Sequence, residues 1–204
     1  MNASYIFTFA PVLLPMTNLS SHKEPLATVL RSRRTIHLFE PMPPPRKALL
    51  DAIELARWAP NHRLTEPWRF YVIGPETADA IAQLNAALVA EKRGARAGQA
   101  KLDRWRTMPG WFAVTSRIAD NAIMTEENYA ACCCAVQNLQ LSLWSQGLGA
   151  KWGTGAVTRD PRFFELLGID PTQEKFVGLF WYGYPADIPT AQRKPVAEIV
   201  TEIP

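Results

Sequence analysis

Short apolar runs and helically spaced apolar stripes alternate along the chain. Apolar residues recur with the helical period over residues 47–58 and 76–93, which predicts two amphipathic helices. Runs rich in aromatic and β-branched residues predict three buried strands, at residues 68–73, 111–115 and 176–182. Because helices and strands alternate, the pattern predicts an α/β or α+β domain in which helices cover a sheet.

A longer stretch, residues 127–146, is apolar on nearly every side of a predicted helix. A helix of this kind lies at the centre of a domain or is covered by a second subunit. Two shorter helices are also predicted. One covers residues 26–30 and ends near Arg33, and the other covers residues 161–168 and is closed by Gly168.

Three segments lack a regular pattern. Residues 40–45 contain four prolines, which exclude a regular helix or a central strand. Residues 94–110 are basic, and we interpret them as a loose, solvated surface segment, with a mobile lid as the alternative. Residues 1–23 are interpreted as an N-terminal extension that precedes a single domain over residues 24–204.

The extension does not have the features of a targeting or spanning segment. Its apolar stretch is interrupted by Pro11 and Pro15 and is too short to span a bilayer. It also lacks the basic region and the cleavage site of a signal peptide. No other stretch is apolar over a spanning length, so we expect no membrane partner.

Composition narrows the function classes only slightly. With 204 residues, 48% of them hydrophobic and 20% charged, the chain is long enough to bury the core of one globular domain. The net charge of +3 is too small to indicate a nucleic-acid partner. It suits a small anionic ligand, as does the charge of many proteins.

The three cysteines are consecutive, Cys132, Cys133 and Cys134. Neighbouring side chains on a helix point about 100° apart, so these three cannot converge on one metal ion. We interpret them as small buried residues of a tightly packed helix. An odd number without dispersed pairs indicates a reducing compartment, and we expect the protein in the cytoplasm.

A glycine pattern and three histidines are present, but neither indicates the function usually associated with such residues. Gly147, Gly149 and Gly153 form a G-x-G-x-x-x-G pattern, yet it follows a predicted helix, whereas a dinucleotide fingerprint leaves a strand and opens a helix. The three histidines lack a second metal ligand at helical spacing. No catalytic triad motif or phosphate-binding loop is found, so catalysis by a side-chain nucleophile is not indicated.

Four polar clusters remain as candidate sites. The first, Arg33-Arg34-Thr35-Ile36-His37, offers guanidinium groups and a hydroxyl to a phosphate, although arginines at a helix end also complement its dipole. The second is the loop Pro60–Trp68, in which prolines flank His62 and Arg63. The third, Lys151–Gly155, is either a simple turn or a stretch whose glycines let the backbone approach a ligand. The fourth is the pair Arg193-Lys194 in the polar tail.

In this order the clusters resemble the nitroreductase family of FMN-dependent oxidoreductases, and its short-chain YdjA-like branch in particular. The resemblance rests on R-R-T-x-H, A-P-N-H-R-L-T-E-P-W, G-L-G-A-K-W-G-T-G and the tail G-Y-P-A-D…R-K-P-V-A-E-I-V. It covers about residues 24–200. It implies an α+β homodimer with a central mixed sheet and FMN at the dimer interface.

The resemblance also assigns roles to residues. The first motif implies that Arg33, Arg34, Thr35 and His37 bind FMN, and the proline-flanked loop implies that His62 approaches the flavin held mainly by the other subunit. The loop after the long helix implies flavin contacts from Lys151, Trp152, Gly153, Thr154 and Gly155, and the tail implies that Arg193 and Lys194 reach the phosphate. FMN itself would carry the chemistry, taking hydride from NADPH or NADH and passing it to a small-molecule acceptor such as a nitro-aromatic or a quinone by a ping-pong reaction.

The sequence departs from the family pattern at three positions. His37 stands where the family usually has Arg or Lys, and an unperturbed histidine titrates near pH 6.5. We therefore expect flavin reduction to depend on pH through His37. Glu66 replaces a usual Gln, and Leu64 replaces a usual Asn, so a flavin contact from Leu64 is not implied.

Three other interpretations stay open on the sequence alone. The chain could be an FMN enzyme of the same fold dedicated to one metabolic substrate, a flavin-binding protein with little turnover, or a purely structural dimer. The residues of the 94–110 segment would distinguish the first, because substrate contacts are common on such segments.

Overall fold

The computed structural model describes residues 23–204, so the predicted extension lies almost wholly outside the described residues. Helix α1, Lys23–Ser32, belongs to a first compact unit, and Arg33–Pro204 forms the second. The helix α1 confirms the one predicted around residues 26–30. All of the sheet and all of the candidate site residues belong to the second unit.

The second unit contains a four-stranded sheet with the order β1-β2-β4-β3. Every neighbouring pair of its strands is antiparallel, so the predicted mixed sheet is wrong for these strands. Among residues 23–204, parallel pairing is limited to an isolated bridge between Thr35 and Ala150. The four strands are β1 (Trp68–Ile73), β2 (Trp111–Arg117), β3 (Gly149–Gly153) and β4 (Glu174–Gly183).

Two of the strand predictions need correction. The strand β3 was not predicted, because its five residues lie between glycines and carry no apolar run. The strand β1 is at the edge of the sheet and is half-exposed rather than buried. By contrast, β4 pairs on both sides and is buried from Val177 onward, as its apolar sequence predicts.

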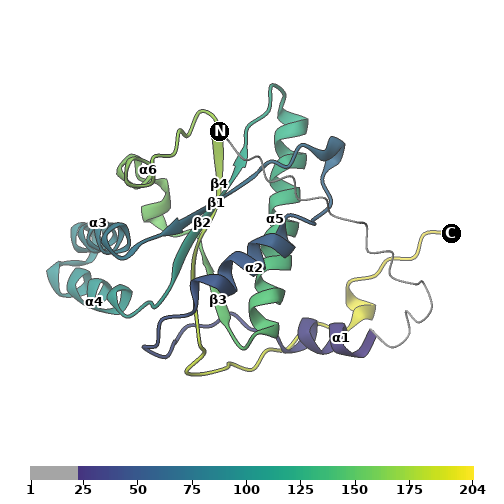
Figure 1. Ribbon diagram of the computed structural model, residues 1–204, viewed down its shortest axis with the longest axis horizontal. Helices are drawn as coiled ribbons and strands as arrows, with labels where there is room; N and C mark the ends of the chain where they lie inside the picture. Colours follow the sequence, from purple (N-terminus) through teal and green to yellow (C-terminus); the bar gives the residue numbers. More distant parts are fainter. Residues whose placement is uncertain (1–22) are drawn as a thin grey trace, which may run out of the picture. The chain divides into compact units, whose positions relative to one another are not determined.

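Helices α2 (Arg46–Ala56) and α5 (Ala122–Ser145) cover one face of the sheet (Figure 1). Their apolar side chains pack on the strand residues Phe112 and Phe180, whose rings stack 4.6 Å apart. The helix α5 begins five residues before its predicted start, because the Asn121 side chain accepts a hydrogen bond from the Met124 amide at 2.8 Å and caps it. Of the three cysteines, Cys132 is buried as expected, but Cys133 is half-buried and Cys134 exposed.

Helices α3 (Pro75–Arg93), α4 (Ala95–Arg106) and α6 (Pro161–Leu167) lie on the opposite face (Figure 1). The core on this side contains Ile81 and Phe163 from the helices and Trp111 and Trp181 from the sheet. The predicted helices over residues 76–93 and 161–168 are confirmed here. Three short 3-10 helices complete the secondary structure of the described residues: η1 (His62–Leu64), η2 (Ala156–Arg159) and η3 (Val196–Glu198).

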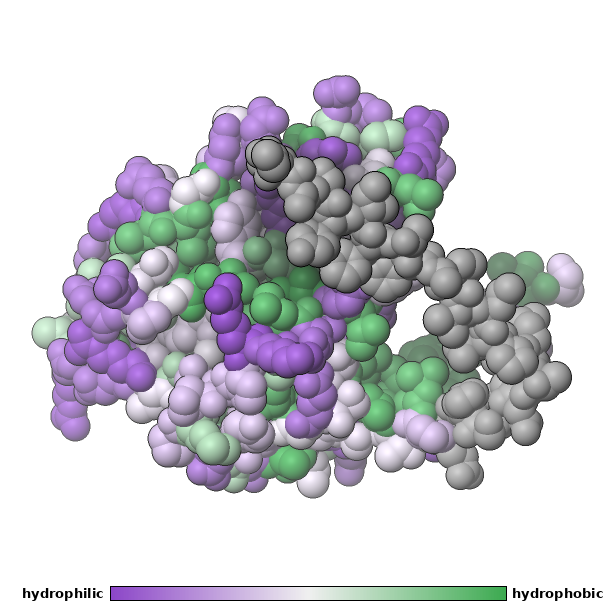
Figure 2. Space-filling model, in the orientation of Figure 1, coloured by the Kyte–Doolittle hydropathy of each residue, from purple (hydrophilic) through white to green (hydrophobic). Residues whose placement is uncertain are grey.

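The basic segment 94–110 is not a loose loop, as predicted, but contains the helix α4. This helix lies close against α3, and Gly98 makes the approach possible because it has no side chain. A Cβ at Gly98 would come within 2.7 Å of the Ala86 carbonyl oxygen and 2.8 Å of the Ala90 Cβ. Many of its charged side chains do point to solvent, and the molecular edge where α4 lies is strongly hydrophilic (Figure 2). The segment therefore combines an ordered backbone with the solvated surface that its charges predict.

Candidate functional site

An extended segment after α1 brings two of the predicted clusters together. The Ile36 amide donates to the Ala150 carbonyl at 3.1 Å, and Thr35 bridges Ala150 in parallel. Farther along, the Glu40 amide donates to Tyr184 at 2.9 Å and the Ala186 amide to Leu38 at 3.0 Å. The segment 35–40 therefore lies between β3 and the chain that follows β4. Through these contacts the R-R-T-x-H cluster lies beside Lys151–Gly155.

The close approach depends on Gly149. A Cβ at this position would overlap the Ile36 side chain, which is completely buried. Gly147, which ends α5 with φ of +77°, and Gly149 thus serve a helix-to-strand connection. The exclusion of a dinucleotide fingerprint is confirmed, because this glycine pattern leaves a helix and enters a strand.

Side chains of an extended segment alternate between its two faces, so Arg33, Thr35 and His37 point away from the buried Ile36. At one end, Arg33 lies near Arg34 and Arg193, and we refer to these three as the arginine cluster. Partial burial, and then the charges of Arg193 and Arg34, lower the pKa of Arg33. The positive charge around Arg33 favours an anion such as a phosphate.

At the other end, His37 lies in a small cavity between α4, β3 and β4. We refer to His37, Lys101, Arg104 and Lys151 as the mixed cluster. The Lys151 ammonium lies 5.4 Å from the centre of the Trp181 ring. Two tryptophans and a methionine complete the lining of the cavity, which consists of His37, Lys101, Arg104, Trp105, Met108, Lys151 and Trp181.

The cations of the mixed cluster shift one another's pKa values in the same direction. Burial lowers the pKa of His37 below its ordinary value, and the charges of Lys151 and Arg104 lower it further. Burial also lowers the pKa of Lys151, followed by the charges of Arg104 and Lys101. Groups that repel in this way gain stability from a ligand that carries or develops negative charge.

Lys101 and Arg104 line this cavity and are candidate site residues that the sequence analysis missed. They were part of a basic run interpreted as solvated surface, and their spacing of three on a helix places them on one side of α4. Recognising α4 as a helix would have grouped these two residues. It would not have shown that they face Lys151, which is distant in sequence.

The remaining members of the Lys151–Gly155 cluster have different surroundings. The Trp152 indole donates to the Val177 carbonyl at 3.0 Å and packs on Phe180, so it belongs to the core beneath α5. Gly153 lies against the Trp181 ring, which leaves no room for a larger side chain there. Thr154 and Gly155 are exposed at the end of β3, where they are accessible to a ligand.

The loop between Pro60 and Trp68 is exposed but held in one conformation. Arg63, Leu64 and Glu66 have positive φ angles of 56°, 50° and 43°, a region that residues other than glycine rarely adopt. The Asn61 side chain accepts from the Glu66 amide at 2.9 Å, which closes the loop on itself. Within residues 23–204, His62 contacts the Arg63 guanidinium at 3.1 Å and is not joined to either cluster by a hydrogen bond or ion pair.

Lys194 is exposed beside Arg193 in the tail, where a long series of residues is also exposed. Several of these are apolar, which is unusual for a polar-looking tail: Val196, Ile199, Val200 and Ile203. The structure therefore brings Arg193 to the arginine cluster and leaves Lys194 at its margin.

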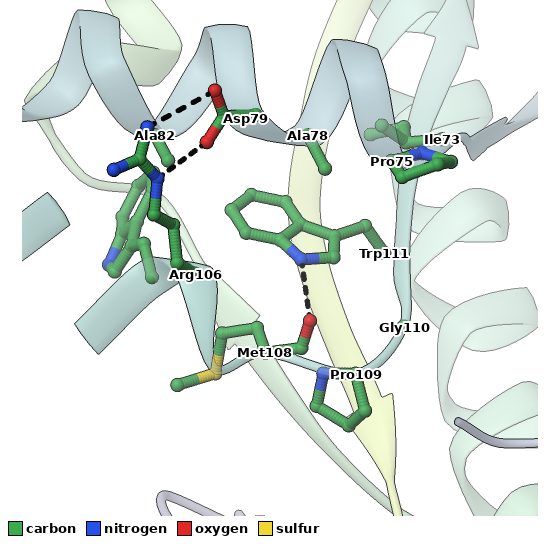
Figure 3. Close-up of a pocket in the computed structure, with 11 residues that line it drawn as sticks. Ile73, Pro75, Ala78, Asp79, Ala82, Arg106, Met108, Pro109, Gly110 and Trp111 are labelled. Atoms are coloured by element: carbon green, nitrogen blue, oxygen red, sulfur yellow. Dashed lines mark hydrogen bonds and ion pairs between the residues drawn. The ribbon is translucent and has the colours of Figure 1, made fainter. Parts of the chain in front are cut away.

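A second cavity, of about 270 Å³, lies between the start of α3 and the end of α4 (Figure 3). The Arg106 guanidinium makes an ion pair with Asp79 on one side of it, at 2.7 Å, and the Trp111 indole donates to the Met108 carbonyl at 3.1 Å. The cavity contains none of the predicted site residues. It shares Trp105 and Met108 with the cavity of the mixed cluster, so these two side chains separate the two spaces.

The described residues contain neither a metal-binding group of side chains nor a membrane-spanning helix. Among residues 23–204, no three His, Cys, Asp or Glu side chains gather in a way that could hold a metal ion. No helix in the same range is long and apolar enough to cross a membrane.

Comparison with known proteins identifies the family. The sequence profile described as "Nitroreductase family" matches residues 30–184, more than half of the chain. The protein belongs to the nitroreductase family. The Bacillus subtilis protein named "Putative NAD(P)H nitroreductase YfhC" is 31% identical over 195 residues, which cover 93% of this chain and all of that protein. The Escherichia coli protein "Putative NAD(P)H nitroreductase YdjA" is 27% identical over 165 residues, or 78% of this chain and 87% of that one.

Solved structures support the same nitroreductase fold. A nitroreductase-like family protein from Bacillus cereus superposes with a TM-score of 0.78 at 31% identity, covering 87% of this chain and 95% of that one. A nitroreductase-like protein from Desulfovibrio desulfuricans, solved in complex with FMN, gives a TM-score of 0.69 at 24% identity, with coverages of 88% and 97%. The nitroreductase-like α+β fold implied by the sequence motifs is therefore confirmed.

Proposed function

We propose that this nitroreductase-family protein is an FMN-dependent NAD(P)H oxidoreductase that reduces nitro-aromatic, quinone or similar acceptors by ping-pong hydride transfer. The observation that carries the proposal is the presence of two cationic clusters at the two ends of residues 33–37. Four steps along an extended chain span about 13 Å. The site thus fits an elongated ligand with a permanent anion at one end and a ring on which negative charge develops at the other.

The arginine cluster fits the phosphate of FMN. Guanidinium groups keep their charge at every physiological pH and offer paired N–H donors to phosphate oxygens. Bound phosphate would also relieve the repulsion that lowers the pKa of Arg33. Thr35 points to the same side as Arg33 and would add a hydroxyl donor, while Lys194 would add an ammonium group at the margin.

The mixed cluster fits the polar edge of the flavin ring. When bound, FMN would accept a hydride from NAD(P)H and pass it to the acceptor, and its reduced ring carries negative charge at that edge. His37, Lys151 and the α4 residues Lys101 and Arg104 would stabilise this charge electrostatically. Thr154 and Gly155, exposed at the end of β3, would approach the ring with their backbone groups.

We further propose a homodimer in which FMN lies at the subunit interface. Large apolar side chains are exposed on a single chain at the loop and near it, with Trp58 at 72% and Leu64 at 82%. The tail adds Ile199 at 70% and Ile203 at 86%. Exposed apolar surface of this extent favours a protein partner. In such a dimer His62 would approach the flavin bound mainly by the other protomer.

A cytoplasmic location is consistent with this proposal. All three cysteines are free, and NAD(P)H is the proposed reductant. The Desulfovibrio desulfuricans protein, solved in complex with FMN, supports the cofactor. The named Bacillus subtilis relative supports NAD(P)H as the source of electrons.

The test is an absorbance spectrum of the purified protein, recorded before and after anaerobic addition of NADPH or NADH. We expect flavin bands that bleach when the nicotinamide is added and return when a nitro-aromatic or quinone acceptor is added. Bands that persist with both nicotinamides would overturn the proposed reductant. Protein that stays colourless after incubation with FMN would overturn the proposed cofactor.

A further inference from the structure

The cavity of the mixed cluster is strongly one-sided in charge. Of its seven lining residues, Lys101, Arg104 and Lys151 are cations, His37 is a potential cation, and none is a carboxylate. The salt bridges found within residues 23–204 do not include these three cations. The positive charge of the cavity is therefore not neutralised inside the described chain.

The proposed cofactor neutralises only part of this charge. Its phosphate would be taken by the arginine cluster at the other end of residues 33–37, and its reduced ring brings at most a single negative charge to the mixed cluster. Three cations then face one anionic charge. Because like charges in a partly buried site are mutually destabilising, the surplus favours a second anion beside the ring.

A buried donor of a residue that lines this cavity also lacks an acceptor. Trp181 is 5% exposed, and its indole Nε1 has no hydrogen-bond partner within the described part of the chain. Buried donors of this kind are rarely left unpaired, and a ligand or an ordered water is the usual explanation. The Trp181 ring lines the cavity, and the Lys151 ammonium lies 5.4 Å from its centre, so this unpaired donor belongs to a residue that borders the cationic space.

We propose that the mixed cluster selects electron acceptors that carry a negative charge, namely aromatic rings bearing a carboxylate. This inference rests on the proposed function and specifies its substrate class. Lys101 is the selecting residue that can be changed most simply, because it is half-buried at the cavity wall and does not belong to residues 33–37. With a nitro-aromatic acceptor, two electrons and two protons convert the nitro group to a nitroso group and water. The electrons come from NAD(P)H in turnover.

The test uses the FMN-loaded protein reduced with dithionite, so that the nicotinamide is not involved. Reoxidation of the flavin is followed by stopped-flow absorbance with 4-nitrobenzoate and with 4-nitrobenzyl alcohol, a neutral compound of similar shape. The ratio of the two second-order rate constants is compared between proteins, which cancels the intrinsic reactivities. We expect Lys101→Gln to reduce the preference for the carboxylate by roughly fivefold, and added salt to reduce it in the unchanged protein.

Arg96→Gln is the matched control, because it removes one positive charge from an exposed position of the same helix, away from the cavity. The proposal is overturned if both variants keep the ratio of the unchanged protein, or if both lower it equally.

The cations could instead bind the phosphate of the dinucleotide. Comparing reduction of the flavin by NADPH with reduction by NADH tests this alternative. If Lys101→Gln slows reduction by NADPH only and leaves the acceptor ratio unchanged, the cations serve the dinucleotide phosphate and the proposal is wrong. Failure of the proposed function itself would look different, since no flavin bands would then be present to follow.

Discussion

The arginine cluster and the mixed cluster lie at the two ends of one short extended segment, yet their charges behave differently. The arginine cluster consists of Arg33, Arg34 and Arg193, whose guanidinium groups remain charged in any folded protein. The mixed cluster contains His37 and Lys151, whose pKa values are both lowered by burial and by neighbouring cations. One end thus has a fixed charge and the other an adjustable one.

This difference matches two different chemical tasks. A phosphate keeps its negative charge through a redox cycle and requires a constant partner. A flavin ring changes its charge when it is reduced, and its potential depends on the cations around it. Variants at each end should therefore alter different properties of the holoenzyme, and changing the connection between the ends should alter both.

The largest effect is expected when the fixed end loses a charge. Arg33→Gln should weaken FMN binding by roughly tenfold to a hundredfold, because a hydrogen bond to a charged group contributes about 1.5–3 kcal/mol. Quenching of flavin fluorescence gives the dissociation constant. Riboflavin, which lacks the phosphate, is the control ligand and should bind the variant and the unchanged protein equally. Equal losses for both ligands would contradict a phosphate role for Arg33.

The connection between the two clusters can be disturbed at Gly149. The added methyl of Gly149→Ala overlaps Ile36 and should cost about 1–3 kcal/mol of unfolding free energy, as overpacking of a core does. Urea denaturation measures this cost. Binding of FMN and of riboflavin should weaken together, since both clusters are displaced from each other.

Gly74→Ala is the matched control for this change, because nothing lies within 4 Å of a Cβ built there. A second variant, Gly149→Ala combined with Ile36→Val, should recover part of the lost stability by freeing space. Without any recovery, the contact between Gly149 and Ile36 would not be the cause.

A smaller effect is expected at the adjustable end. In the unchanged protein the Lys151 ammonium lies over the Trp181 ring, and its charge lowers the pKa of His37. Lys151→Met removes this cation. The flavin midpoint potential should fall by roughly 20 mV, equivalent to about 1 kcal/mol for a two-electron couple. Affinity for oxidised FMN should change little. Spectroelectrochemistry measures the potential, and Lys92→Met, on the exposed end of α3, should leave it unchanged.

The sequence predicted the parts of the fold that are rich in apolar residues. Helices α2 and α3 and the strands β2 and β4 lie where their patterns place them. The helix α4 has good helix-forming residues and an amphipathic spacing, but its many basic residues were interpreted as a solvated surface and the spacing was overlooked. The strand β3 is short and bounded by glycines, and it forms because β4 and residues 35–37 pair with its two edges.

The candidate site was predictable to a similar degree. Residues on one continuous motif, such as Arg33 and His37, could be recognised from the resemblance to the family. Lys101 and Arg104 could not, because only the packing of α4 on α3 and the sheet brings them to Lys151. The Trp181 donor was also invisible in the sequence, where it was simply one apolar residue of a buried strand.

The smallest predicted effect concerns the titration of His37. Its pKa is lowered by burial and then by Lys151 and Arg104, so the imidazole is mostly neutral at neutral pH and gains its proton only below the ordinary value near pH 6.5. The unfolded chain binds this proton more readily. The neutral imidazole therefore contributes fully to stability above about pH 6.5, and the contribution is lost as the pH falls through the lowered pKa.

His37→Gln removes the titrating group, so neither the unfolding free energy nor the flavin potential should depend on its protonation. Between about pH 7 and pH 5 the variant should lose less unfolding free energy than the unchanged protein, by under about 1 kcal/mol. Over the same range, the flavin potential of the unchanged protein should rise more steeply than that of the variant, because protonated His37 adds a charge beside the reduced ring. Denaturation and potential measurements at both pH values test this. Identical pH profiles would show that the adjustable charge of this end resides in Lys151 instead.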